Sequence, residues 1–114
     1  KIKMVRLVKE YKFQVDDKKK IGHMRCDFAD GHLANQWFPT DLANETENLH
    51  EIQNVVNKIM FEEIPSYDKV VELCGGEGID KTTNFFIYEG NYNYWINLIP
   101  IRGEYNYYIH VYKK

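Results

Sequence analysis

The sequence is short of several residue types, and each shortage excludes a class of protein. Cysteine occurs twice, as Cys26 and Cys74, which is too few for a small scaffold stapled by disulfide bonds. No apolar run approaches the roughly 18–20 residues that a membrane-spanning helix needs, because charged residues interrupt every hydrophobic stretch. Serine occurs once, as Ser66, which leaves a serine nucleophile almost without candidates.

The residues that are present indicate a folded domain. The chain has 114 residues, of which 44% are hydrophobic and 15% aromatic, and its formal net charge is −2. A chain of this length buries roughly two-thirds of its unfolded surface, which is enough for a hydrophobic core. Because no repeat, low-complexity tract or linker interrupts the sequence, we expect a single domain over residues 1–114.

Amino-acid usage also points to a source and a location. Lysine outnumbers arginine 12 to 3, and asparagine, isoleucine and tyrosine are abundant. Codons rich in A and T encode these residues, so we expect a bacterial gene, and an accessory protein of a phage or mobile element fits this description. The two cysteines are too few for a disulfide scaffold and fit a reducing compartment, and the sequence has no recognisable signal peptide. We therefore expect a cytoplasmic location.

Charge is divided unevenly along the chain. Residues 1–25 have a net charge of +6, residues 26–80 a net charge of −10, and residues 81–114 a net charge of +2. Such asymmetry is typical of a binding face, but it also arises when basic edge strands and acidic helices are simply solvated. Both interpretations stay open at this point.

Hydrophobic periodicity predicts strands at both ends of the chain. Apolar and polar residues alternate over residues 3–15, 23–28 and 33–38, with Asp30-Gly31 as a tight turn. The alternation returns over residues 82–88, 92–101 and 105–112, and Pro100 is expected near a strand end because it cannot donate a ladder hydrogen bond.

The middle of the chain is predicted to be helical. Apolar residues recur at helical spacing from Leu49 to Met60, with Asn48 or Asn44 as the cap, and Pro65 ends the helix near Glu63. Ser66 caps a second, short helix that ends at Gly75-Gly76. The predicted fold is an α+β domain of order β-β-β-α-α-β-β-β, in which one long and one short helix pack on an antiparallel sheet of about five to six strands.

Two motifs resemble ligand sites but lack essential residues. The segment from Gly75 to Thr82 nearly spells a phosphate-binding loop, yet Asp80 replaces the glycine before the lysine, and a helix precedes where a strand is required. His23, Cys26 and His32 lie within ten residues, but residues three apart on a strand point to opposite faces. We therefore predict no cofactor and no metal.

Catalysis also lacks converging residues. Cys74 lies at the end of the short helix, where the helix dipole disfavours a thiolate. A small enzyme would require His110 to approach Cys74 or Asp80 in three dimensions, which the sequence does not decide. We predict that the chain is not an enzyme, with a site invisible in the sequence as an alternative.

The most distinctive feature is the aromatic C-terminal part. Ten of the 17 aromatic residues lie between Phe85 and Tyr112. If they line an exposed sheet face, the candidate binding residues are Tyr92, Tyr94, Trp95, Tyr108 and Tyr112. Otherwise they form cross-strand pairs and pack under the helix.

Three functions follow from this feature. The first hypothesis is a small non-catalytic domain that binds a protein partner, since tyrosine concentrates at protein interfaces. The second is a single-stranded nucleic-acid-binding module that uses the basic first strand and the tyrosines, although the acidic middle disfavours it. The third is the small enzyme above.

Overall fold

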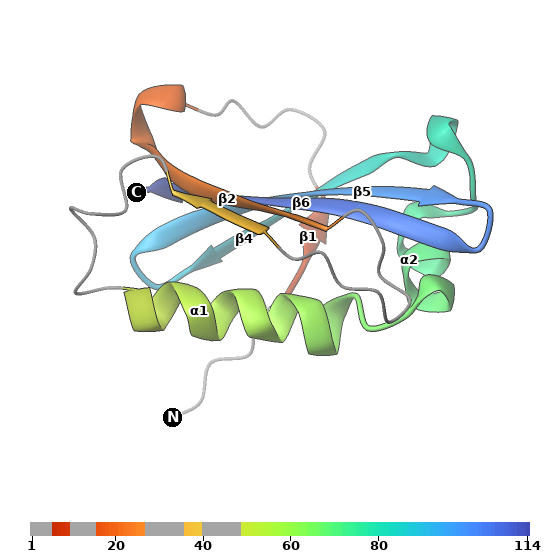
Figure 1. The fold of residues 1–114 in the computed structure, drawn as a ribbon, viewed down its shortest axis with the longest axis horizontal. Helices are drawn as coiled ribbons and strands as arrows, with labels where there is room; N and C mark the ends of the chain where they lie inside the picture. The colour runs from red at the N-terminus through yellow and green to blue at the C-terminus, as the bar shows by residue number, and fades with distance from the viewer. Residues whose placement is uncertain (1–5, 10–15, 27–35, 40–48) are drawn as a thin grey trace.

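A computed structural model describes residues 6–9, 16–26, 36–39 and 49–114 (Figure 1). The elements follow in the order β1 (Val8–Lys9), η1 (Asp17–Lys19), β2 (Lys20–Cys26), β3 (Gln36–Pro39), α1 (Leu49–Lys58), η3 (Ile59–Glu63), α2 (Tyr67–Cys74), η4 (Ile79–Lys81), β4 (Thr83–Glu89), β5 (Tyr92–Ile101) and β6 (Glu104–Lys113). This order confirms the predicted α+β class. The remaining parts of the three strands predicted in the first 38 residues, the Asp30-Gly31 turn and the helix caps at Asn44 and Asn48 lie outside the described residues.

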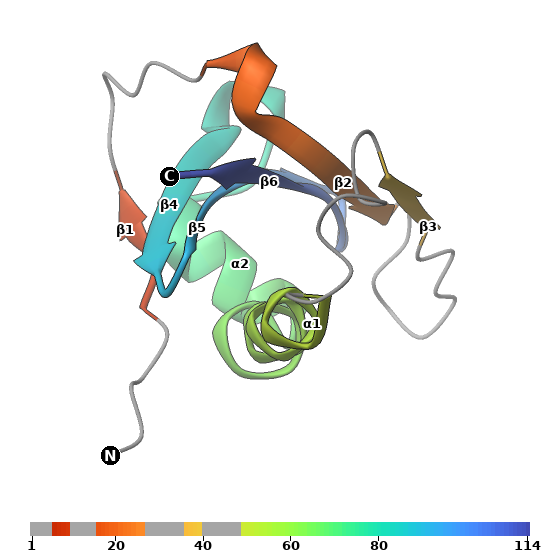
Figure 2. The same cartoon turned by 90° about the vertical axis from the view of Figure 1, so that its left-hand side faces the viewer.

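The strands form one antiparallel sheet in the order β1-β4-β5-β6-β2-β3. Strands β4, β5 and β6 follow one another as a meander through two short turns. Gly90 and Gly103 occupy these turns with φ of 63° and 81°, a conformation that glycine adopts without strain. Both helices lie on the same side of the sheet (Figure 2). The sheet therefore has a side covered by helices and an opposite side.

Helix α1 forms because its apolar residues repeat at helical spacing and so share one face. Ile52, Val55 and Val56 are buried on this face. Ile59 continues the buried face into η3, which is a turn of π-helix and therefore wider than the α-helix before it. The Ile64 N–H donates to the carbonyl of Ile59 at 2.9 Å, and Pro65 then prevents a further helical hydrogen bond. The predicted end of the helical segment near Glu63 is confirmed.

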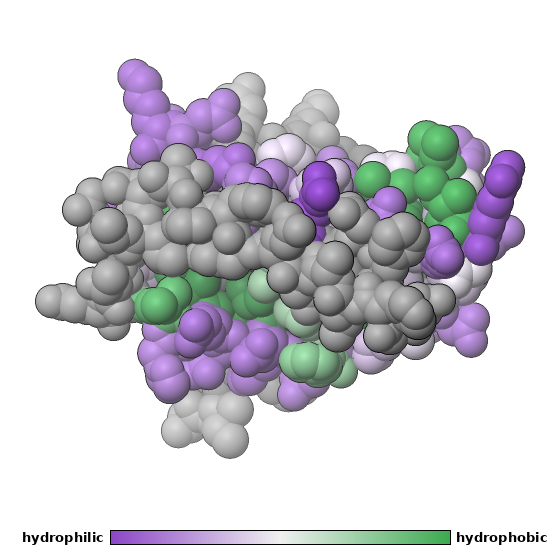
Figure 3. Space-filling model, in the orientation of Figure 1, coloured by the Kyte–Doolittle hydropathy of each residue, from purple (hydrophilic) through white to green (hydrophobic). Residues whose placement is uncertain are grey.

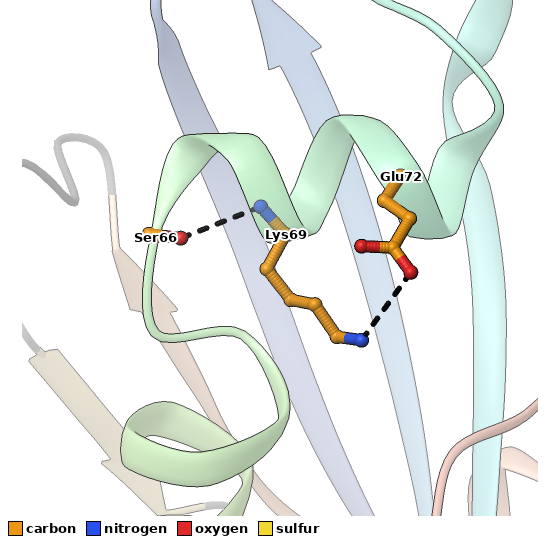
Figure 4. A network of polar contacts seen from close by, with 3 residues as sticks. All are labelled: Ser66, Lys69 and Glu72. Atoms are coloured by element: carbon orange, nitrogen blue, oxygen red, sulfur yellow. Dashed lines mark hydrogen bonds and ion pairs between the residues drawn. The ribbon is translucent and has the colours of Figure 1, made fainter.

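Helix α2 begins and ends at the predicted residues. The Ser66 side chain accepts a hydrogen bond from the backbone N–H of Lys69 at 3.3 Å, which satisfies one of the helix's unbonded donors (Figure 4). At the other end Gly75 has φ of 78° and donates its N–H to the carbonyl of Val71.

The core lies between the helices and the sheet. Alternate residues of the strands face the helices, and the buried ones are Ile21, Phe85, Ile87, Tyr92, Tyr94, Ile96, Leu98, Tyr105, Tyr107, Ile109 and Val111. The Tyr105 hydroxyl donates to the backbone carbonyl of Ile64 at 2.7 Å, which connects β6 to the segment between the helices. Within the described ranges, no helix has the length and apolar character needed to cross a membrane.

Candidate binding surface

The side of the sheet turned away from α1 and α2, here called the outer face, carries the candidate surface. Residues directly opposite one another on paired strands project to the same face. The register therefore arranges the outer-face residues of β4, β5, β6 and β2 in three rows: first Tyr88, Asn93, Tyr112 and Lys20, then Phe86, Trp95, His110 and His23, then Asn84, Asn97, Tyr108 and Arg25. Every row ends on β2 in a basic side chain or an imidazole.

The middle row, here called the ring row (Phe86, Trp95, His110 and His23), is a continuous stack across four strands. The ring centroids of Phe86 and Trp95 are 6.4 Å apart, and those of Trp95 and His110 are 5.0 Å apart. The two imidazoles follow at 5.6 Å. Val8 of β1 lies opposite Phe86 and extends the row to a fifth strand.

Rings in the ring row turn their faces toward one another. The interplanar angles are 16°, 29° and 24° from Phe86 to His23, so each pair is close to parallel. A nucleic-acid base needs an accessible ring face on which to stack. Because neighbouring rings occupy those faces, the outer face is better suited to apolar protein side chains than to bases.

Among the outer-face side chains whose exposure the structure describes, the most exposed apolar ones lie at the β1–β4 side. Val8 is 44% exposed and Tyr88 is 42% exposed, whereas Phe86 beside them is buried. Trp95 and Tyr108 are partly buried. The accessible apolar area therefore begins at β1 and β4 and continues toward the ring row.

Basic side chains follow the β2 side of the outer face. Lys20 and His23 are three residues apart, but the β2–β6 register shifts by one residue between Lys20 and Gly22. Because of this bulge, Lys20 lies opposite Tyr112 and His23 lies opposite His110, so both project to the outer face. Arg25 follows two residues later. The helix layer on the opposite side of the sheet carries five acidic residues against two lysines over residues 49–74. Among the described residues, the cations of β2 and the acidic side chains of the helix layer thus lie on opposite sides of the sheet.

Several polar atoms of the outer face are enclosed. Trp95 Nε1, His110 Nδ1 and Asn93 Oδ1 are inaccessible to solvent and form no hydrogen bond within the described part of the chain. The neighbouring row differs, because the Asn97 side-chain amide donates to Asn84 Oδ1 at 2.7 Å. Each of these atoms has lost its hydration without a hydrogen bond to replace it, which costs free energy in the folded state.

The two imidazoles and the Tyr112 hydroxyl of the outer face are neutral at pH 7. Burial, followed by the charges of Lys20 and His23, lowers the pKa of His110 to about 4, and Asp17 of η1 acts weakly in the opposite direction. Burial, followed by the charges of Lys20 and Arg25, also lowers the pKa of His23. Burial raises the pKa of Tyr112 to about 12.

The five predicted binding residues do not share one surface. Tyr92 and Tyr94 are 2% and 1% exposed and lie in the core under the helices, which removes them from any binding face. Trp95, Tyr108 and Tyr112 lie on the outer face, with Tyr112 buried among its neighbours. The expectation of one tyrosine face is corrected, because alternate residues of a strand point to opposite sides of the sheet.

The catalytic pair considered for the enzyme alternative is not assembled. Cys74 packs in the core on the helix side, whereas His110 lies on the outer face, so the sheet separates them. Asp80 does share a cavity of about 290 Å³ with Cys74. Burial raises the pKa of the Cys74 thiol, although a hydrogen bond with Thr83 opposes the effect.

The helix side holds a second cavity. A cleft of about 480 Å³ beside α1 is lined by four apolar and two polar residues: Met24, Leu49, Ile52, Val56, Gln53 and Asn57. Apolar surface is visible in the gap between α1 and the sheet in Figure 3. Across the described ranges, no group of three or more histidine, cysteine or acidic side chains is placed to hold a metal ion.

Sequence reasoning did not identify the imidazole pair as part of a surface. Period-two alternation places His23 with Arg25, and His110 with Tyr108 and Tyr112, on the polar side of their strands. The signal that was missing is the β2–β6 register, which places the two imidazoles opposite each other.

The fold and the surface together define an α+β domain with a partly exposed aromatic sheet face. Comparisons with protein-family models, with curated proteins and with solved structures found no match for the chain. What the domain does is therefore inferred from the chemistry of its surfaces.

Proposed function

We propose that this chain is a non-catalytic binding domain that docks a protein partner on the outer face of its sheet. The observation that carries this proposal is the ring row, which lies on the side of the sheet opposite the helices and adjoins the exposed side chains of Val8 and Tyr88. Exposed aromatic side chains beside a well-packed centre are typical of protein-interface hot spots.

The surface also indicates what kind of partner it fits. Apolar area at β1 and β4 favours an apolar contact, whereas Lys20 and Arg25 at the β2 side favour carboxylates. A second copy of the chain would bring like charges together if the same faces met, so a different protein with an acidic rim is the better match.

Nucleic acid is the less favoured partner. The cations of β2 would attract phosphates, but the parallel packing of the rings leaves few faces on which bases could stack. Binding of this kind would weaken steeply as salt concentration rises, and titration with a labelled single-stranded oligonucleotide at low salt measures it directly.

Two exposed aromatic residues on different layers give a matched experiment. Tyr88 is 42% exposed on the outer face, and Phe61 is 64% exposed on η3 of the helix layer. The wild-type chain, Tyr88→Ser and Phe61→Ser are each immobilised and incubated with nuclease-treated extract of the native host. A candidate protein is then purified, and its direct affinity for each chain is measured.

The proposal predicts a partner whose affinity falls about tenfold or more for Tyr88→Ser, because a hot-spot aromatic contributes more than 1 kcal/mol. Phe61→Ser is expected to bind as tightly as the wild type. Equal loss in both variants, or loss only in Phe61→Ser, would contradict the proposal. Tight oligonucleotide binding that Tyr88→Ser abolishes would replace the protein partner by nucleic acid.

A further inference from the structure

A second property of the outer face concerns the strand pair β2–β6 and does not depend on any partner. His23 and His110 lie opposite each other on these strands, with ring centroids 5.6 Å apart. Lys20 and Arg25 lie on the same face of β2, in the rows on either side of His23. Two imidazoles that are each able to accept a proton are therefore placed between two permanent cations.

The surroundings of His110 are poorly suited to a protonated imidazole, because neighbouring rings keep water away from it. Its ring is packed against Trp95 at 5.0 Å, against Tyr108 at 6.2 Å and against Tyr112 at 6.5 Å. Its Nδ1 atom is enclosed and forms no hydrogen bond with the residues that the structure describes. A proton bound there would remain poorly solvated unless the surrounding strands separated.

Charged groups near His110 come from two elements, β2 and η1. Lys20 and His23 of β2 disfavour a proton on His110, whereas Asp17 of η1 favours it. On β5 the facing side chains are the uncharged Trp95 and Asn93, and on β6 itself they are two tyrosines. The cations are thus concentrated on β2, the strand that joins the edge strand β3 to the rest of the sheet.

We propose that β2 and β6 form an acid-sensitive joint, in which proton uptake by the His23–His110 pair separates β2 from the sheet. Strand β3 leaves with β2, and the meander β4-β5-β6 remains packed on the helices. Separation gives both imidazoles access to water and moves them away from each other. It also exposes the backbone edge of β6, which then becomes an unpaired edge strand.

Hydrogen exchange resolved by peptide or residue tests this proposal in the purified chain. Exchange is measured at about pH 7.5 and about pH 5, and the rates are corrected for the intrinsic pH dependence of exchange. Because the pKa of His110 is lowered from its ordinary value of 6.5 to about 4, the opening equilibrium of β2 is expected to rise about 10- to 30-fold at the lower pH. Amides of β4 and β5 are expected to keep their protection.

Two variants separate the imidazole pair from other sources of acid sensitivity. His110→Phe keeps an aromatic ring in the row but removes its titration, and it is expected to lose most of the acid response. His50→Gln removes an exposed histidine of α1 and is expected to respond like the wild type.

The proposal would be overturned if the amides of β2 were equally protected from exchange at both pH values. It would also be overturned if β4 and β5 lost as much protection as β2, or if β2 of His110→Phe lost as much protection in acid as β2 of the wild type. If His110→Phe does not fold, NMR titration of the wild-type imidazoles decides. The proposal then requires the His110 imidazole to titrate well below the ordinary histidine value of about 6.5, and a midpoint at or above that value would overturn it.

Discussion

At the scale of single residues, the contribution of a buried tyrosine to stability depends on whether its hydroxyl group forms a hydrogen bond. Tyr105 and Tyr94 are both buried in the core between the sheet and the helices. The Tyr105 hydroxyl donates to the carbonyl of Ile64 at 2.7 Å, whereas the Tyr94 hydroxyl forms no hydrogen bond within the described residues. Burial raises the pKa of Tyr94, which keeps this hydroxyl protonated. The two tyrosines therefore contribute differently to stability although their rings are buried alike.

Removing each hydroxyl measures this difference. Tyr105→Phe is expected to lower the free energy of unfolding by about 1–2 kcal/mol, because the carbonyl of Ile64 loses its buried partner. Tyr94→Phe is the matched control and is expected to stay within about 0.5 kcal/mol of the wild type, or to be more stable. Urea unfolding of both variants checks the pair. A larger loss in Tyr94→Phe than in Tyr105→Phe would contradict the hydrogen-bond assignment.

The Cys74 thiol is expected to react slowly in the folded chain. It is 5% exposed, and its pKa is raised by burial, so both access and the thiolate population are low. In a Cys26→Ser background, labelling with a thiol reagent at about pH 8 is expected to be at least about 100-fold slower than in urea. Labelling of the folded chain at the rate of the unfolded chain would show that Cys74 is accessible and reactive.

At the scale of secondary-structure elements, local rules account for the helices better than for the sheet. Ser66 and Gly75 occupy the cap positions that their chemistry favours, and Pro65 separates the two helical segments. The strands of the meander were also predictable, because alternation continues through β5 and β6. Pro100 lies one residue before the end of β5, as a residue without an N–H donor should.

The Ser66 cap is expected to stabilise α2 by a measurable amount. Ser66→Ala removes the acceptor for the Lys69 N–H and is expected to cost about 1 kcal/mol of unfolding free energy. Ser66→Asp retains an acceptor, and its unfolding free energy is expected to remain near that of the wild type.

The ion pair of Lys69 and Glu72 in Figure 4 spans 3.7 Å at an exposed position, so Glu72→Ala is expected to change stability little. Thermal unfolding of the three variants tests this order, and a cost for Glu72→Ala above that for Ser66→Ala would refute it.

At the scale of the whole molecule, the sheet has one buried face and one chemically distinct outer face. The α+β fold class, the order of the elements and the helical segments were predictable from the sequence, because hydrophobic periodicity is a local property of the chain. The candidate surface was predictable only in part. Alternation alone separates Tyr92 and Tyr94 from Trp95, so the sequence already contained the reason to divide them. The strand order and register, which bring β2 beside β6, depend on packing of distant segments and have no local signature.

Stability of the whole chain is expected to fall in mild acid. The pKa of His110 is about 4 in the folded chain, below the ordinary value of 6.5, so the unfolded chain binds one more proton between these two pH values. This contribution to stability is complete above about pH 6.5 and is lost as pH falls to about 4, by at most about 2 kcal/mol after allowance for partial exposure. Glu63, whose pKa is raised by burial and by Glu62, acts in the opposite direction.

Thermal unfolding across this pH range checks the sign. The Tm of the wild type is expected to decrease more steeply with falling pH than the Tm of His110→Phe, and His50→Gln serves as the control. A wild-type Tm that rises between about pH 6.5 and 4, with the same slope in His110→Phe, would exclude a neutral His110 as the source.

The central claim is that a protein partner docks on the outer face rather than on the helix layer. Its most direct measurement is site-specific photocrosslinking in the native host, with the crosslinking amino acid placed at position 88 in one chain and at position 61 in another. We predict a discrete protein adduct from position 88 and none of the same mass from position 61. An adduct formed only from position 61, or no adduct from position 88 when the chain is folded and abundant, would contradict the claim.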